Sequence, residues 1–292
     1  MAHKPVLLSE VLKIFEGVQL KVFFEGTVGA GGHGAAILEA HPEIERYLAC
    51  DRDPAAHQLA GANLAPWENK VEWIRGPFAD LEEYLDAKKI REIDGFLIDV
   101  GVSSMQLDSK ERGFSFQGDA PLDMRMDPES DLTAERIVNE MPEKELARIF
   151  FEYGEERRSR QVARAIVEAR RKRRIRTTGE LVAIVKPVTI WGKLHPATLV
   201  FQGLRIAVND ELGQLKRGLD AAIKRTGAGG RIAAISFHSL EDRIVKNSFR
   251  DAKDRLEILT KKPIGPTIEE IKENPRSRSA KLRAAEKKIN EL

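Results

Sequence analysis

The sequence has one cysteine, no long apolar run and almost no net charge, and each of these shortages excludes some classes of protein or site. The single cysteine, Cys50, permits no internal disulfide and no cysteine cluster for zinc, so we predict a reducing, cytoplasmic setting and no metal site. No apolar run approaches the roughly 18 residues of a membrane span. The segment Met1 to Leu12 also lacks the basic, apolar and small-residue order of a signal peptide, so we expect no membrane partner.

Charge and length limit the remaining classes. Lys and Arg total 48 against 46 Asp and Glu, which leaves a formal charge of +2, so any nucleic-acid-binding surface must be local. Apolar and charged fractions of 42% and 32% are ordinary for a globular protein. A chain of 292 residues exceeds the usual single-domain size, so we expect two domains, or one large domain with an insertion.

Short β-branched or aromatic runs alternate with helical patterns. Their near-continuous apolar character is typical of parallel strands that helices cover on both faces, so the fold class is predicted to be α/β with a Rossmann-like sheet. Helices are expected near residues 34–40 and 54–64. The predicted strands are Val22–Phe24, Tyr47–Cys50, Val71–Ile74, Phe96–Val100 and Arg231–Phe237.

The gap between the fourth and fifth strands is far longer than a crossover requires. Its helical pattern predicts an inserted domain at 105–195, with the sheet domain formed by 1–104 and 196–292. The chain returns through a helix near 209–224, and a final helix is expected near 279–288. An insertion at the carboxyl end of a strand lies beside the ligand crevice of an open α/β sheet, so we expect this domain to capture substrate.

A glycine-rich turn, Glu25 to Gly34, follows the first strand and contains five glycines. Gly29, Gly31 and Gly34 fit the G-x-G-x-x-G pattern, and Asp51 stands about 20 residues further on, as in a nucleotide-binding βαβ unit. Glycine permits positive φ and close approach of the backbone to a ligand. A glycine-rich turn that holds no ligand is the alternative.

Other strand ends also carry candidate ligand groups. Asp51 suits a ribose diol, because a carboxylate can accept hydrogen bonds from both hydroxyls. Phe78, after the third strand, offers an apolar face to an adenine ring, and Asp99, after the fourth, can accept from an amino group. Helix capping or a turn is the alternative role for each carboxylate.

The acidic residue before the glycines helps to separate two cofactor classes. Glu25 would repel a pyrophosphate but suits a cationic amino-acid moiety, so the pattern favours S-adenosylmethionine over a nicotinamide dinucleotide. No Walker-type lysine follows the glycines, which weighs against an ATPase.

Long motifs along nearly the whole chain carry a family resemblance. The sequence closely resembles the bacterial ribosomal RNA small subunit methyltransferase H family, which methylates the exocyclic amino nitrogen (N4) of a cytidine in the decoding region of 16S rRNA with S-adenosylmethionine. Beside the glycine turn, the matching segments are His3–Glu10, Asp99–Asp108, Glu111–Phe116, Pro121–Asp127, Tyr153–Arg157, His195–Thr198, Val208–Leu212, Ser236–Arg243 and Asn274–Ser279.

This resemblance implies a Rossmann-like methyltransferase sheet and a set of cofactor contacts. Glu25 stands where the family usually has Asp, and His33 is implied to act through its backbone near the methionine carboxylate. 16S rRNA, within the small ribosomal subunit, is the implied partner, and the chain is expected to be a monomer or a homodimer. The implied cofactor contacts are Gly31, Gly32, His33, Asp51, Phe78, Asp99 and Gln106.

The reaction needs acceptors that hold the hydrogens of a weakly nucleophilic amino group. Asp99 and Ser103 are our candidates for this role. His238 either faces the reaction crevice or caps the helix that follows it. Another RNA or a protein substrate, and a non-catalytic RNA-binding assembly factor, are the alternative functions.

A basic segment in the predicted insert is the candidate RNA-binding surface. Its cations lie along one helical side, while Val162, Ile166 and Ala169 lie along another, as in a helix that docks on its domain and offers cations to phosphates. A solvated basic face is the alternative. The candidate RNA contacts are Arg157, Arg160, Arg164, Arg171, Arg173 and Arg174, which the tail residues Arg276, Arg278, Lys281 and Arg283 extend.

Overall fold

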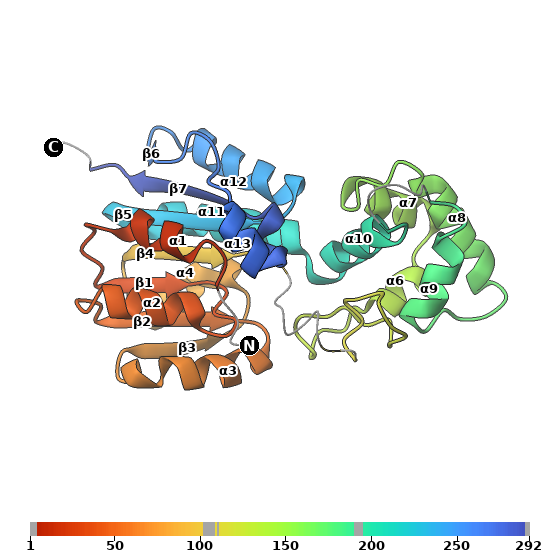
Figure 1. Cartoon of the computed structure of the whole chain (residues 1–292), viewed down its shortest axis with the longest axis horizontal. Helices are drawn as coiled ribbons and strands as arrows, with labels where there is room; N and C mark the ends of the chain where they lie inside the picture. Colours follow the sequence, from red (N-terminus) through yellow and green to blue (C-terminus); the bar gives the residue numbers. More distant parts are fainter. Residues whose placement is uncertain (1–4, 102–108, 110, 190–194, 290–292) are drawn as a thin grey trace. The chain divides into compact units, whose positions relative to one another are not determined.

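The computed structural model describes residues 5–101, 109, 111–189 and 195–289 (Figure 1). The chain divides into two compact units, one formed by Met1–Gly101 with Leu212–Leu292 and the other by Val102–Glu211. The predicted insert, 105–195, lies within the second unit. The second unit begins three residues before the predicted start. It ends later than predicted because helix α10 (Thr198–Asn209) buries Val200, Phe201 and Leu204 in the core of the inserted unit.

The first unit contains a seven-stranded sheet in the order β3-β2-β1-β4-β5-β7-β6. Its first five strands are parallel neighbours, and β7 is antiparallel to both β5 and β6. This order confirms the predicted Rossmann-like sheet with an insertion between strands four and five. The strands are β1 (Val22–Glu25), β2 (Arg46–Asp51), β3 (Val71–Arg75), β4 (Ile93–Asp99), β5 (Thr226–Ser236), β6 (Leu256–Ile258) and β7 (Lys281–Lys287).

Helices cover both faces of the sheet (Figure 1). Side chains alternate along β1, so Phe23 stacks on Tyr47 at 5.4 Å between ring centroids, while Phe24 stacks on Phe96 at 5.7 Å in the core under α4, α11 and α12. The helices at the predicted positions 34–40, 54–64 and 209–224 are confirmed. The helices are α1 (Leu8–Phe15), α2 (Gly32–Ala40), α3 (Pro54–Leu64), α4 (Leu81–Ala87), α11 (Glu211–Arg225), α12 (Ser239–Asp251) and α13 (Ile268–Glu273), with 3-10 turns η1 (Ala65–Trp67), η2 (Phe78–Asp80) and η3 (Pro275–Ser279).

The final helix predicted near 279–288 is wrong, because these residues form strand β7. The segment is rich in Ala, Lys and other good helix formers, but it fills the space between β5 and β6, where backbone pairing outweighs propensity. Leu282 pairs with Ile235, and the Arg283 guanidinium reaches Asp242 of α12 with Nε 2.7 Å from Oδ1. The carboxyl end of β5 therefore lies beside the start of β7.

The second unit is mainly helical in its described part, apart from residues 111–133, which form turns and irregular backbone. Asn209, at the end of α10, ties down the segment that precedes α6, because it accepts from the Met126 N–H and donates to the Met124 carbonyl, each at 2.7 Å. Among the residues that the structure places, no helix is long and apolar enough to cross a membrane. Besides α10, the helices in the described part of this unit are α6 (Ala134–Glu140), α7 (Glu143–Glu152), α8 (Ser159–Arg170) and α9 (Thr178–Val185).

Candidate functional site

The glycine-rich turn lies over the carboxyl ends of three strands. The Gly26 N–H donates to the Leu97 carbonyl at 2.8 Å, and the Val28 N–H donates to the Cys50 carbonyl at 2.9 Å. Gly29 and Gly31 have φ of +52° and +79°, values that side-chain-bearing residues rarely adopt. The turn is therefore held by β4 and β2, and it delivers the chain into α2.

The glycines serve different purposes in this turn. A Cβ on Gly32 would lie 2.5 Å from Pro5 Cγ, and one on Gly34 would lie 2.8 Å from the Tyr47 hydroxyl, so these two glycines allow the protein to pack on itself. A Cβ on Gly29 would meet nothing within 4 Å. The open side of the turn is thus at Gly29, rather than at every glycine of the pattern.

Helix α2 begins at Gly32 with no side-chain cap, and its N-cap, Gly31, is left-handed. The backbone N–H groups of a first helical turn have no intrahelical partner and point along the axis, where they suit an anion such as a carboxylate. The His33 side chain does not join them, because its buried ring places Nε2 2.9 Å from the Val6 carbonyl oxygen. The ring of His33 thus contacts Val6, and the ligand contact that the resemblance implies for the His33 backbone stays a prediction.

Glu25 is buried beneath the turn and accepts a hydrogen bond from the Tyr47 hydroxyl at 2.7 Å. Burial, helped by the nearby charges of Asp99 and Asp51, raises the pKa of Glu25 to about 8. Its carboxyl group is then mostly neutral at pH 7. The expectation that its charge would repel a pyrophosphate therefore does not hold, and another group must separate the two cofactor classes.

Asp51, at the end of β2, binds the backbone of the glycine-rich turn through its side chain. Its Oδ2 accepts from the Gly29 N–H at 3.0 Å, and its Oδ1 accepts from the Asp53 N–H at 2.9 Å. Burial raises the pKa of Asp51, while these two bonds oppose the rise. Each carboxylate oxygen can still accept one more bond. Asp53 is the N-cap of α3 and accepts from the Ala55 N–H at 3.1 Å.

Asp99, at the end of β4, has an unsatisfied oxygen. Its backbone N–H donates to Thr27 Oγ1 at 2.7 Å, but its buried Oδ1 has no hydrogen-bond partner among the residues described. Burial, followed by repulsion from Glu241, raises the pKa of Asp99 to about 7. A buried acceptor without a hydrogen-bond partner lowers the stability of the folded protein, so such groups are rare. A ligand that donates a hydrogen bond to Asp99 would remove this cost.

Phe78 is more deeply packed than the sequence suggests. Its ring lies against α11, where a Cβ on Gly218 would be 2.4 Å from Phe78 Cδ2, and its own Cβ lies 2.8 Å from the position a Cβ would take on Gly26. The side chain is only 5% exposed. It leaves little of its ring face for an adenine in this arrangement.

Sequence reasoning missed Glu241, a buried carboxylate on α12 near Asp99. His238 is the N-cap of α12, and Glu241 Oε2 accepts from the Phe237 and His238 N–H groups at 2.8 and 3.2 Å. His238 therefore caps a helix, as one of its two predicted roles required. The capping-box spacing is present in the sequence, but a histidine in place of Ser or Thr obscures it. Ser103 and Gln106 lie outside the described residues.

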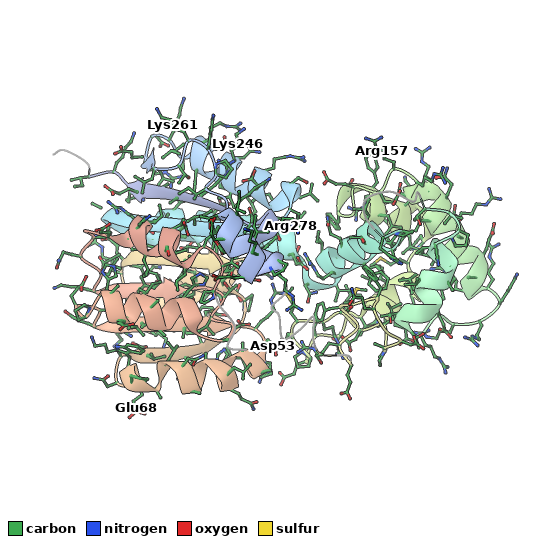
Figure 2. All side chains as sticks on the ribbon, in the orientation of Figure 1. Asp53, Glu68, Arg157, Lys246, Lys261 and Arg278 are labelled. Atoms are coloured by element: carbon green, nitrogen blue, oxygen red, sulfur yellow. The ribbon has the colours of Figure 1, made fainter. Side chains whose placement is uncertain are left out.

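The predicted RNA-binding arginines fall into two groups in the inserted unit. Arg164 pairs with Glu168 at 3.0 Å, Arg174 pairs with Glu135 and Glu140 at 2.7 and 3.1 Å, and Arg173 pairs with Glu180. In the described part of the chain, no ion pair holds the exposed Arg157, Arg160 or Arg171, and Figure 2 shows Arg157 at the surface. Val162 and Ile166 are buried on the opposite side of α8.

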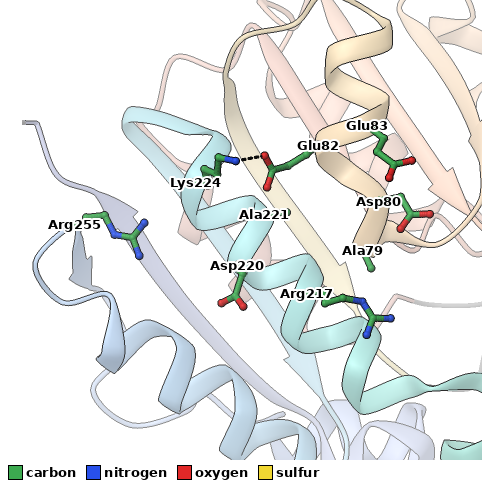
Figure 3. A pocket seen from close by; sticks show the side chains of 9 residues that line it. All are labelled: Ala79, Asp80, Glu82, Glu83, Arg217, Asp220, Ala221, Lys224 and Arg255. Carbon is green, nitrogen blue, oxygen red and sulfur yellow. Dashed lines mark hydrogen bonds and ion pairs between the residues drawn. The ribbon is translucent and has the colours of Figure 1, made fainter.

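A groove of about 550 Å³ lies on the first unit between α4 and α11 (Figure 3). It shares no residue with the carboxylates at the strand ends, and an ion pair between Lys224 and Glu82 spans it. We assign it no ligand. Its lining residues are Ala79, Asp80, Glu82, Glu83, Arg217, Asp220, Ala221, Lys224 and Arg255.

Known proteins resemble this chain along nearly its whole length. A family model described as the MraW methylase family matches residues 1–288. A protein named ribosomal RNA small subunit methyltransferase H from Protochlamydia amoebophila is 49% identical over 98% of this chain and 97% of its own length. Proteins of the same name from Heliobacterium modesticaldum and Persephonella marina are 46% and 47% identical, each over 98% of this chain and over 98% and 99% of their own lengths.

Among solved structures, an rRNA methylase from Streptococcus thermophilus aligns over 99% of both chains with 10% identity and a TM-score of 0.46, a likeness too distant to bear on the site. The sequence matches confirm the resemblance predicted from the motifs. The chain belongs to the MraW methylase family.

Proposed function

We propose that this chain uses S-adenosylmethionine to methylate small-subunit ribosomal RNA, and that the target is N4 of a cytidine in the decoding region of 16S rRNA. One observation carries the cofactor assignment. The carboxyl edge of the sheet presents the start of α2, which has no side-chain cap, and the end of β4, where Asp99 Oδ1 has no hydrogen-bond partner among the described residues. This pairing of an anion site with a carboxylate is complementary to the carboxylate and ammonium of an amino-acid moiety.

Asp99 also separates the two cofactor classes, now that Glu25 does not. A pyrophosphate at the start of α2 would bring further negative charge toward Asp99, whereas a methionine moiety brings a cation to it. S-adenosylmethionine supplies a methyl group already activated on a sulfonium. The protein's task is to align the cytosine nitrogen with that methyl group, and alignment alone can contribute about 7–11 kcal/mol.

Asp99 is proposed to accept a hydrogen bond from the ammonium group or from the target amino group, and Ser103 to assist it. The two roles of Asp99 give different kinetics. A variant Asp99→Ala that binds the cofactor poorly but reacts at the normal rate when saturated would assign Asp99 to the cofactor alone. A variant that loses rate at saturation would assign it to the amino group. Gln106 remains a proposed cofactor contact, and Phe78 remains one only through the small part of the residue that is exposed.

RNA binding is proposed for both units. Of the predicted arginines in the inserted unit, Arg157, Arg160 and Arg171 are proposed as the phosphate contacts, since the other three, Arg164, Arg173 and Arg174, are held in ion pairs. In the sheet unit, the turn η3 leads into β7, whose first residue pairs with the last residue of β5 at the carboxyl edge. The exposed Arg278 of this turn is therefore near the reaction edge, where a flipped nucleotide would leave its phosphates.

A binding test addresses the cofactor directly. At 100 times its Kd, a ligand that binds only the folded state adds about 2.7 kcal/mol to the stability. We expect thermal stabilisation by S-adenosylmethionine and none by NAD, and the reverse would support a nicotinamide enzyme. Radiolabelled cofactor should then transfer its methyl group to 16S rRNA in small ribosomal subunits. RNA binding without any transfer would favour a non-catalytic assembly factor, and transfer to protein would redirect the substrate assignment. The proposed substrate also implies a cytoplasmic location.

A further inference from the structure

The segment Pro5–Leu7 packs directly on the start of α2. Pro5 lies against Gly32, where a Cβ would come within 2.5 Å of its ring, and the Val6 carbonyl oxygen is 2.9 Å from His33 Nε2. Gly32 and His33 are the first two residues of α2. Two consecutive residues of this segment thus contact the helical turn that is proposed to hold the cofactor's carboxylate.

Leu7 fixes the same segment in an unusual backbone conformation. It is the N-cap of α1 with φ of 55° and ψ of 34°, in the left-handed region that non-glycine residues rarely adopt. Its side chain is completely buried. Such a conformation persists only where the surrounding contacts enforce it.

One of these contacts comes from the far end of the chain. Glu270, on α13, accepts the Leu7 N–H with Oε1 at 2.8 Å, across a separation of 263 residues. The Leu7 N–H belongs to the same peptide group as the Val6 carbonyl, whose oxygen contacts His33. Glu270 is thus joined to α2 through Leu7, Val6 and His33, although it belongs to an element near the carboxyl terminus.

We infer that Pro5–Leu7 is a clamp that positions the first turn of α2 for the cofactor, and that Glu270 is a positioning residue for it. This inference rests on the proposed function of α2 as the site for the methionine carboxylate. The backbone N–H groups of that turn bind an anion well only if the turn is already in place. If the turn must be ordered on binding, the free energy of that ordering is subtracted from the affinity. Loss of the Glu270 bond releases the segment that holds the turn and weakens cofactor binding without touching the reacting atoms.

The test compares Glu270→Ala, Glu270→Gln and the control Glu269→Ala in the full-length protein. Glu269 is an exposed glutamate on the same helix, one position away. For Glu270→Ala we expect the KM and Kd for S-adenosylmethionine to rise about three- to tenfold, with kcat at saturation within about twofold of wild type. Glu270→Gln keeps an acceptor oxygen and should restore wild-type binding, and Glu269→Ala should leave it unchanged.

Hydrogen exchange separates the clamp from the cofactor assignment. Glu270→Ala should speed the exchange of backbone amides in α2 and in residues 7–11, and Glu269→Ala should not. A variant Glu270→Ala that lowers the melting temperature but leaves the KM and Kd unchanged would overturn the positioning role. If the wild-type protein binds no S-adenosylmethionine, the proposed function fails, while faster exchange in α2 still establishes the contact path.

Discussion

Cofactor affinity should depend on pH through Asp99, and the variant Asp99→Asn should remove this dependence. The pKa of Asp99 is raised to about 7 in the free protein, first by burial and then by the charge of Glu241. A cationic ligand binds the ionised carboxylate, so affinity rises with pH through this value. Below it, binding must first expel a proton and loses about tenfold per pH unit.

The expected magnitudes follow from this pKa. A group with a pKa of about 7 is roughly 9% ionised at pH 6 and 91% at pH 8, so the Kd should fall about tenfold between them. Asp99→Asn removes a charge-assisted hydrogen bond of about 1.5–3 kcal/mol, which corresponds to a loss of roughly 10- to 150-fold at pH 8. The loss should be about tenfold smaller at pH 6, where the wild-type side chain is already mostly neutral.

Isothermal titration calorimetry with S-adenosylmethionine at pH 6, 7 and 8 measures both quantities. Repeating the titration at pH 7 in buffers with different ionisation enthalpies counts the protons released, and we expect about half a proton per bound cofactor for the wild type. Asp99→Asn should release about half a proton fewer. Glu241→Gln removes the repelling charge but keeps the capping acceptor, so it should shift the midpoint of the pH dependence to lower pH.

Equal wild-type affinity at pH 6 and pH 8 would show that the ionisation of Asp99 does not control cofactor binding. The same conclusion would follow if Asp99→Asn kept the pH dependence, because another group would then carry it. If Asp99→Asn bound the cofactor more weakly but released as many protons as the wild type, Asp99 would still contact the cofactor, but its pKa could not be raised to about 7.

The remaining predictions concern stability and RNA binding. The raised pKa of Glu25 means that the folded state holds a proton which the unfolded state releases at lower pH, so this group costs stability increasingly as the pH rises from about 4.5 to about 8. In urea unfolding, the free energy of unfolding of Glu25→Gln minus that of the wild type should therefore be about 2 kcal/mol larger at pH 8 than at pH 6. An equal difference at both pH values would contradict the raised pKa of Glu25. The double variant Arg160→Ala with Arg171→Ala should reduce the salt slope of RNA binding by roughly 1.4 to 2, while an unchanged slope would exclude these two cations as phosphate contacts. Arg278→Ala should lower RNA affinity a few-fold with no change in cofactor binding, and the matched control Arg91→Ala, an exposed arginine just before β4 at the opposite edge of the sheet, should not; equal effects would remove Arg278 from the RNA surface.

Sequence patterns located the strands of the parallel sheet well because β1, β2, β4 and β5, which lie inside the sheet, are largely buried on both faces. They failed for β7, whose Ala- and Lys-rich residues prefer helix in isolation and become a strand only because β5 and β6 leave a place between them. The boundary of the inserted unit was missed for a similar reason. Which unit contains α10 depends on the hydrophobic core in which it packs, and tertiary packing is not visible in a local sequence pattern.

Candidate site residues were easier to locate than to assign roles. The positions of Asp51 and Asp99 follow from strand ends, which meet at one edge in a parallel sheet. The state of Glu25 does not, because its neutral form depends on burial and on the Tyr47 hydroxyl, and neither is visible in a linear motif. The role of Glu270 was also hidden, since its partner, Leu7, lies at the other end of the chain.

We propose above that this chain methylates a cytidine amino nitrogen in small-subunit RNA. The most direct test of this proposal is mass spectrometry of nucleosides from 16S rRNA, after small ribosomal subunits lacking the modification are incubated with S-adenosylmethionine and either the wild-type protein or Asp99→Asn. We expect N4-methylcytidine at one position in the decoding region with the wild-type protein and much less with the variant. Methylation of a ring carbon, of a ribose or of another base, or no methylated nucleoside at all, would contradict the proposal.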